Sequence, residues 1–136
     1  MIDLNEILYY GRFYPDAPGG EKPAWWLCVS DHAVLDTETV RKNFSYADTE
    51  KIEASGQFLP LFRTDILRLE KEFMQNRDEK AILRLCENNP QWDYDIAFKV
   101  YIEERQLTRE WFEFERAHLR RDAEDWCRQH GLPYRK

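Results

Sequence analysis

The stretch that decides the fold is residues 108–130, TREWFEFERAHLRRDAEDWCRQH. Because an α-helix turns by about 100° per residue, this stretch can be drawn on a helical wheel with Trp111 at 0°. Six apolar side chains then fall within one arc of about 160°, and they are Trp111, Trp126, Leu119, Phe112, Ala123 and Cys127. Thr108 is a suitable N-cap, and Gly131 suits the residue after the helix end. The stretch therefore predicts one long amphipathic helix whose apolar arc faces the core.

Two carboxylates, Glu115 and Asp122, fall inside this arc, at about 40° and about 20° on the wheel. A carboxylate on a buried face must be paired or protonated, because an unpaired buried charge costs several kcal/mol. Three arginines elsewhere in the chain can supply a partner: Arg63, Arg84 and Arg105. Three interpretations stay open: a structural ion pair, a face covered by a partner chain, or a small-ligand or catalytic pocket. Glu115, Asp122 and the flanking Trp111 and Trp126 are therefore candidate binding residues.

Three further helices are expected before this one. Thr64 can cap a helix that runs to about Asn76, with apolar residues at helical spacing along one face. Asp78 can cap the next, which ends at residues 88–90 because the residue before a proline avoids the helical region. Asp93 can cap a third. These helices would form a three- or four-helix assembly with the last one.

The N-terminal part mixes helix and strand. An acidic N-cap followed three residues later by Glu predicts a short helix over residues 3–10. Residues 15–23 hold prolines and glycines and predict a loop. Two runs rich in strand formers, 24–29 and 33–40, predict a β-hairpin. Residues 41–60 fit strand, helix or loop. The expected fold is a mostly helical α+β single domain over residues 1–136, with the short helix and hairpin packed on the helical assembly.

Two adjacent tryptophans, Trp25 and Trp26, lie in the first strand of the predicted hairpin. Successive side chains of a strand point to opposite faces of the sheet, so one ring enters the core. The other is covered by a helix or exposed as a binding anchor, a role in which tryptophan is common. Trp25 therefore joins the candidate binding residues.

The charge balance is acidic. The net charge is −6, and residues 1–76 account for most of it with 13 acids against 8 bases. Nucleic-acid binding requires clustered Lys and Arg, so we expect none, and the acid excess favours a basic protein partner. Three scattered cysteines do not form a disulfide framework, and neither a leader nor a membrane span is expected. We expect a cytoplasmic protein that does not bind membranes, with its oligomeric state open.

Motifs for catalysis or cofactor binding do not stand out. Cys28 with His32 and Cys127 with His130 offer zinc ligands, but about a hundred residues separate the two pairs. One Glu-x-x-His element, Glu115 to His118, is half of what a di-iron site needs. No serine lies in a Gly-x-Ser-x-Gly motif, and no phosphate-binding loop occurs. We predict no catalytic residue, no metal and no cofactor.

The final helix resembles a known family. Residues 111–115, Trp-Phe-Glu-Phe-Glu, followed by Leu119, Ala123 and Trp126, resemble the C-terminal pattern of the bacterial family catalogued as uncharacterised protein family zero-one-five-eight. The segment 58–73 is similar to the middle of that family. That family has no assigned chemistry, so the resemblance implies a related fold and no site.

Two functions follow as expectations. The first is a non-catalytic interaction or regulatory protein, of the inhibitor or immunity type, whose acidic surface binds a basic partner. Its expected mark is an acidic patch continuous with an exposed aromatic side chain. The alternative is a small-ligand-binding protein or enzyme that uses Glu115 and Asp122, which predicts a pocket there and a carboxyl pKa above its usual range.

Overall fold

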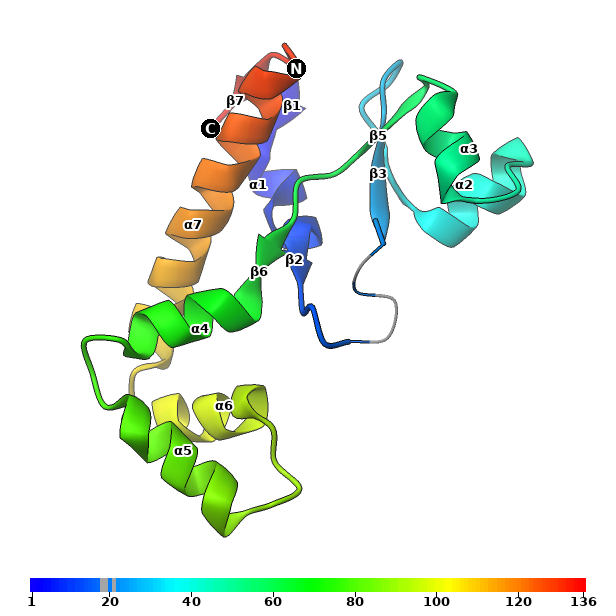
Figure 1. The fold of residues 1–136 in the computed structure, drawn as a ribbon. Coiled ribbons are helices and arrows are strands. Elements are labelled where there is room, and N and C mark those ends of the chain that lie inside the picture. Colours follow the sequence, from blue (N-terminus) through cyan, green and yellow to red (C-terminus); the bar gives the residue numbers. More distant parts are fainter. Residues whose placement is uncertain (18–19, 21) are drawn as a thin grey trace. The chain divides into compact units, whose positions relative to one another are not determined.

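The computed structural model describes residues 1–17, 20 and 22–136 (Figure 1). It is 56% helical and 14% strand, which confirms the predicted mostly helical α+β class. The chain divides into two compact units. We call residues 1–64 with 119–136 unit 1, and residues 65–118 unit 2. The last helix, α7 (Thr108–Gln129), contributes residues to both units.

A three-stranded antiparallel sheet of order β4-β3-β5 organises one part of unit 1. Its strands are β3 (Trp25–Cys28), β4 (Val34–Asp36) and β5 (Phe58–Pro60). Trp26 lies opposite Leu35 on one side and Pro60 on the other, and its ring is fully buried. The predicted hairpin is therefore present, and residues 58–60 of the ambiguous segment complete the sheet.

The second predicted strand is shorter than expected. We predicted strand over residues 33–40, but β4 ends at Asp36 and helix α2 (Thr37–Phe44) begins at once. The reason is local: the Asp36 carboxylate accepts the N–H of Thr39 at 2.7 Å, which caps the helix. Helix α3 (Thr49–Ala54) follows, capped in the same way by Asp48.

The two helices and the sheet share a small core. Trp26, Val40, Ile52 and Phe58 form this cluster, and each is almost completely buried. Val40 comes from α2 and Ile52 from α3, so each helix contributes its apolar side to the sheet. The ambiguity of residues 41–60 is thus resolved as two short helices and one strand.

The remaining elements of unit 1 surround the C-terminal half of α7. They are β1 (Ile2–Asp3), α1 (Leu4–Ile7), the 3-10 helix η1 (Leu8–Gly11), β2 (Arg12–Phe13) and β7 (Tyr134–Arg135). β1 and β7 pair in parallel. The core here is apolar, with Leu4, Leu8 and Leu119 fully buried. The predicted short helix at residues 3–10 corresponds to α1 and η1.

The end of α7 follows the prediction. Gly131 adopts a left-handed conformation with φ of 64°. The Leu132 N–H donates to the carbonyl of Cys127 at 2.8 Å, as expected for a helix that stops at a left-handed glycine.

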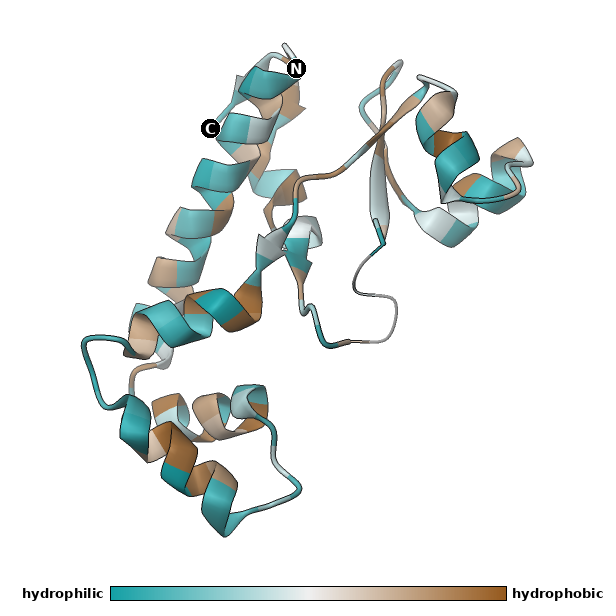
Figure 2. Ribbon diagram, in the orientation of Figure 1, coloured by the Kyte–Doolittle hydropathy of each residue, from teal (hydrophilic) through white to brown (hydrophobic). Residues whose placement is uncertain are grey.

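Unit 2 contains three short helices and the first turns of α7. The short helices are α4 (Ile66–Met74), α5 (Glu79–Asn88) and α6 (Tyr94–Glu104). Asp78 and Asp93 cap α5 and α6 as predicted. Thr64 does not cap α4: it lies in β6 (Thr64–Asp65), and Asp65 accepts the N–H of Arg68 instead. Figure 2 shows hydrophobic and hydrophilic residues alternating along these helices.

One predicted core residue of α7 is exposed. Phe112 keeps 58% of its accessible surface, whereas Trp111 is buried. The reason is that α7 buries different sides in the two units. In unit 2 the rings of Trp111 and Phe114 pack on Phe73. In unit 1 the buried positions are Leu119, Ala123, Trp126 and Cys127. A single arc drawn over the whole helix is therefore too simple.

Candidate functional site

Glu115 is buried, as the wheel predicted, and is 2% exposed. It belongs to unit 2, where Glu70 of α4 is 1% exposed. The negative charge of Glu115 is one of the causes that raise the pKa of Glu70. Asp95 of α6, whose side chain is 22% exposed, is the third member of what we call the buried carboxyl cluster after its two buried glutamates: Glu70, Asp95 and Glu115. Glu70 and Asp95 are not among the candidate residues expected from the sequence. A wheel over residues 66–74 would have found Glu70, because the residues three and four positions on either side along α4 are all apolar.

Glu70 holds a proton in this cluster. Burial raises the pKa of its carboxyl group to about 10, with the hydrogen bond to Asp95 as the second cause. Neither Glu70 oxygen has a donor within hydrogen-bond distance. Both observations agree if Glu70 is neutral, since a protonated carboxyl can donate to the Asp95 carboxylate. Asp95 Oδ2 in turn lies 3.1 Å from Lys99 Nζ.

The cluster is a poor candidate for chemistry on a solute. At 1–2% exposure, neither Glu70 nor Glu115 can touch a molecule dissolved in water. Among the residues that the structure describes, no group of three or more His, Cys, Asp or Glu side chains is placed to hold a metal ion. The arrangement can store a proton and set a pH dependence of stability, and only Asp95, at 22% side-chain exposure, reaches the surface.

Asp122, the other predicted carboxylate, belongs to unit 1. Its Oδ2 accepts a hydrogen bond of 2.7 Å from the hydroxyl of Thr64, which is itself 1% exposed. An arginine is the partner expected from the sequence for an ion pair, and the structure provides this threonine instead. Two of the arginines lie in other contacts: Arg84 pairs with Asp78, and Arg105 lies over the ring of Tyr101. Asp122 therefore connects α7 to the segment that precedes α4.

The two tryptophans of α7 are core residues. Trp126 donates its indole N–H to the carbonyl of Pro60 at 3.1 Å and packs on Phe62. Trp111 meets the rings of Phe98 and Phe73 with centroids 4.8 and 5.5 Å apart. Both rings are more than nine-tenths buried, so they stabilise the fold and present no binding surface.

Trp25 differs from the other candidates because it lies at a cavity. Its ring is half-buried and packs on Tyr10, with centroids 4.5 Å apart. The cavity has a volume of about 210 Å³ and is lined by residues of unit 1 alone. Tyr10 comes from η1, which was expected to be part of a plain helix. From the sequence, one of the two tryptophans is expected either to be covered by a helix or to be exposed as a binding anchor. The sequence does not locate the cavity.

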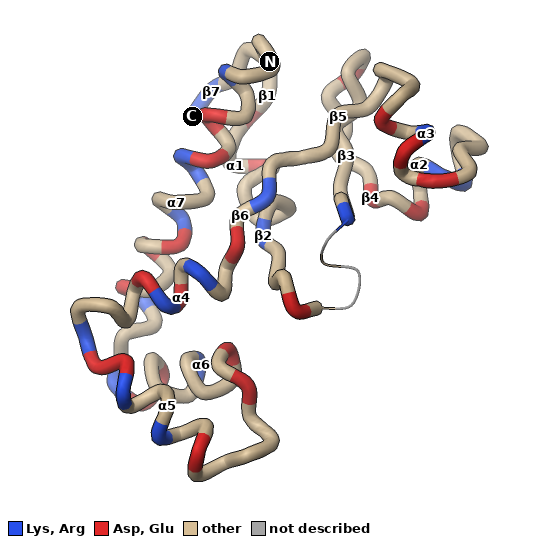
Figure 3. Tube along the Cα trace, in the orientation of Figure 1, with Lys and Arg blue, Asp and Glu red and all other residues tan. Residues whose placement is uncertain are grey.

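A second surface combines acids with exposed apolar side chains. Phe44 at the end of α2 is 46% exposed, and Val29 is 41% exposed. They line a groove of about 450 Å³ together with Cys28, Ser30, Gly56, Gln57 and Phe58. Residues 31–57 hold six acids and three bases, a net charge of −3. We call the groove and the surrounding surface of α2 and α3 the α2–α3 face. Figure 3 shows acidic residues on both helices, with basic ones between them.

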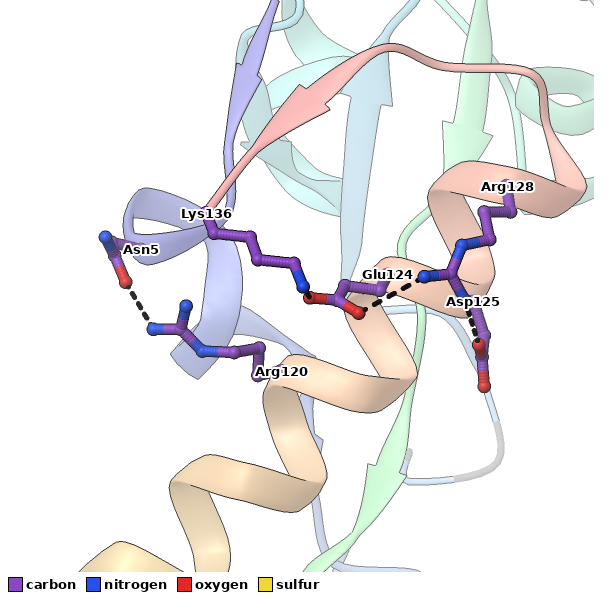
Figure 4. Close-up of polar contacts among 6 residues, drawn as sticks. All are labelled: Asn5, Arg120, Glu124, Asp125, Arg128 and Lys136. Carbon is purple, nitrogen blue, oxygen red and sulfur yellow. Dashed lines mark hydrogen bonds and ion pairs between the residues drawn. The ribbon is translucent and has the colours of Figure 1, made fainter.

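Charged contacts join the end of α7 to its neighbours. Glu124 lies between Lys136 and Arg128, at 3.3 and 3.4 Å (Figure 4). Arg120 donates to the side-chain oxygen of Asn5 at 2.9 Å. Arg128 and Lys136 keep about 60% or more of their side chains exposed, although Glu124 keeps only 13%, so each contact contributes little to stability. They attach the chain ends to the helix and do not form a site.

Comparisons with known proteins found no match for the chain among family models, curated proteins or solved structures. The resemblance to the uncharacterised bacterial family therefore stays a prediction. Within the described residues, no helix has both the length and the apolar character that crossing a bilayer requires.

Proposed function

We propose that the protein is a non-catalytic interaction protein and that its α2–α3 face binds a basic protein segment. The observation that carries this proposal is Phe44. Its ring is exposed, lines a groove, and lies within residues 31–57, where six acids outnumber three bases. Residues 31–57 thus combine an exposed aromatic side chain with an excess of acids, and this combination supports a binding role.

The groove and the charges have different physical roles in this proposal. An aromatic side chain that leaves water in a partner's interface supplies much of the affinity, so Phe44 is the expected anchor. The ring rests on Phe58, with centroids 5.0 Å apart, which limits the entropy lost when a partner immobilises it. The groove beside it has room for an apolar side chain of the partner.

The acids supply attraction at a distance. Asp48, Glu50 and Glu53 are exposed on or beside α3. Lys42 and Glu38 pair with each other at 2.9 Å within α2, and this pair leaves five acids and two bases in residues 31–57. Such exposed charges speed encounter with a basic partner and are screened by salt. Binding should therefore weaken as ionic strength rises.

The alternative function, which uses Glu115 and Asp122, has less support. Glu115 lies in the interior of unit 2, and Asp122 is engaged with Thr64 in unit 1. A ligand could reach Glu115 only if unit 2 opened, and at Asp122 it would compete with the hydroxyl of Thr64.

A comparative capture experiment tests the proposal. The wild-type chain, Phe44→Ala and Phe112→Ala are immobilised, exposed to lysate at low salt, and eluted with rising salt. Phe112 is the matched control, because it is an exposed phenylalanine of unit 2. We expect a basic protein that the wild type and Phe112→Ala retain, that Phe44→Ala loses, and that salt releases. Its affinity is then measured by titration against a double variant, Glu50→Gln with Glu53→Gln. Equal retention by Phe44→Ala would refute the proposal.

A further inference from the structure

We infer that the cavity beside Trp25 is a binding site for a small aromatic carboxylate. It is separate from the α2–α3 groove, because the two share no lining residue. The inference therefore does not depend on the proposed protein partner, and it concerns a different ligand chemistry.

Aromatic rings form the walls of this cavity. Tyr10 and Trp25 stand at 53° to each other, and Phe13 and Phe62 complete the apolar lining. The Phe62 ring is tightly held: a Cβ placed on Gly11 would lie 2.1 Å from Phe62 Cε2. Only glycine fits at position 11, because the Phe62 ring lies directly against its Cα. Gly11 therefore allows the Phe62 ring to line the cavity. A flat apolar ligand fits between such side chains because it can stack or meet them edge to face.

Positive charge gathers at the same cavity. The lining residues that the structure describes include Arg12, Lys22 and Arg63 and no acid. Residues 1–64 hold six bases and ten acids, so half of the bases in this acidic segment line one cavity. A ligand with a negative charge is therefore favoured here, in contrast to the rest of the surface.

The Arg63 guanidinium is held in a defined place. Its central carbon lies 4.1 Å from the centroid of the Phe13 ring, and its Nη2 donates to the carbonyl of Gly20. A guanidinium has five N–H donors in a rigid fork, so these contacts leave donors for a carboxylate. Arg12 lies nearby and donates to the Tyr14 hydroxyl at 3.3 Å. A carboxylate bound at Arg63 thus meets a positioned partner and places its ring near the aromatic walls.

The volume limits the size of the ligand. A water molecule occupies about 30 Å³ in the liquid, so a cavity of about 210 Å³ corresponds to about seven waters. Benzoate, a ring with one carboxylate, is of this order. A ligand so small has few contacts, and we expect a dissociation constant of about 1 mM.

Benzoate, benzamide and inorganic phosphate are the probes. Each is titrated into the full chain, and the indole signal of Trp25, assigned with Trp25→Phe, is followed by NMR. Benzamide keeps the ring and lacks the charge, whereas phosphate keeps a charge and lacks the ring. We expect benzoate to shift this signal at about millimolar concentration and to bind at least about tenfold more tightly than either control. No shift with benzoate, or equal binding of benzamide or phosphate, would overturn the inference.

Two variants locate the charge. Arg63→Gln should weaken benzoate binding about tenfold or more, since it removes the charge that a carboxylate meets. Lys51→Gln removes a base outside the cavity and should leave binding unchanged. Circular dichroism checks that both variants fold. If Arg63→Gln unfolds, Arg63→Lys replaces it. Lysine keeps the charge but lacks the guanidinium fork, so the affinity for benzoate should fall, while millimolar benzoate should still shift the Trp25 indole signal. Unchanged affinity in a folded Arg63 variant contradicts the inference.

Discussion

Replacing Glu70 with glutamine is expected to make unit 2 resist alkaline pH. The Glu70 carboxyl is 1% exposed and faces Asp95 and Glu115, while Lys99 approaches the cluster through Asp95. Burial raises its pKa from 4.5 to about 10, so the folded protein keeps a proton that the unfolded chain releases. Glutamine has nearly the same shape, carries no charge, and its amide can donate to Asp95 as the protonated carboxyl does.

The magnitude follows from proton linkage. Between the unfolded pKa of 4.5 and the folded pKa of about 10, the folded state binds one proton more than the unfolded state. Stability therefore falls as pH rises through this window, by about 1.4 kcal/mol per pH unit. From about pH 6 to about pH 8 the wild type loses about 3 kcal/mol through this one group. The glutamine variant loses none of it, and its advantage grows with pH.

Hydrogen exchange read by mass spectrometry measures this effect where it arises. Protection of peptides from α4 and α6 is recorded over the pH range, after correction for the intrinsic exchange rate. The matched control is Glu72→Gln, which removes an exposed carboxylate of the same helix that pairs with Arg68 at 3.7 Å. We expect the control to follow the wild type and Glu70→Gln to keep its protection. Parallel loss of protection in wild type and Glu70→Gln would show that Glu70 does not hold the proton.

Three further predictions concern stability, each measured by urea unfolding. Thr64→Val should cost about 1–2 kcal/mol, because Asp122 then loses the 2.7 Å hydrogen bond that the hydroxyl donates. Trp111→Ala should cost about 3–5 kcal/mol, since its ring is buried among other rings, whereas Phe112→Ala should change stability by less than about 0.5 kcal/mol. Gly131→Ala should cost about 1 kcal/mol, because φ is 64° and the strain is not relieved by any new contact. A neutral Trp111→Ala or a costly Phe112→Ala would contradict the assignment of the two faces of α7.

Helix ends were predictable where the signal lies within a few residues. Asp78 and Asp93 cap their helices by accepting an N–H three residues ahead, and Gly131 ends α7 by its own backbone conformation. The predicted N-cap of α4 was wrong by only one residue, because Asp65 caps this helix and Thr64 does not. Thr64 and Asp65 are adjacent and both can cap, and the choice depends on Asp122, which is distant in sequence and engages the threonine hydroxyl.

Residues 37–40 show where a local pattern is ambiguous. The sequence Thr-Glu-Thr-Val alternates as a strand does, and Val40 suits either a strand or a helix. The cap at Asp36 and the burial of Val40 against Trp26 and Ile52 select the helix. Ile52 belongs to α3, which lies outside residues 37–40. The sequence of residues 37–40 alone therefore does not decide between strand and helix.

A helical wheel can predict only part of the buried carboxyl cluster. The wheel placed Glu115 on the buried side of α7 correctly, because that placement depends on one helix. Its neighbours come from α4 and α6, and their proximity depends on how three helices pack. The wheel then suggested a binding site, since an acid among apolar residues also occurs in functional pockets. Packing decides between the two meanings, and here it encloses the acid.

This difference directs the search for function toward exposed side chains. An enclosed acid changes stability with pH, but it can meet a solute only if the unit opens. Phe44 and Trp25 give weaker signals in the sequence, since a single aromatic residue is usually a core residue. They become candidates only when the structure shows an exposed ring beside a groove and a half-buried ring beside arginines. Both binding proposals for this protein therefore rest on exposed or half-buried rings and not on a buried charge.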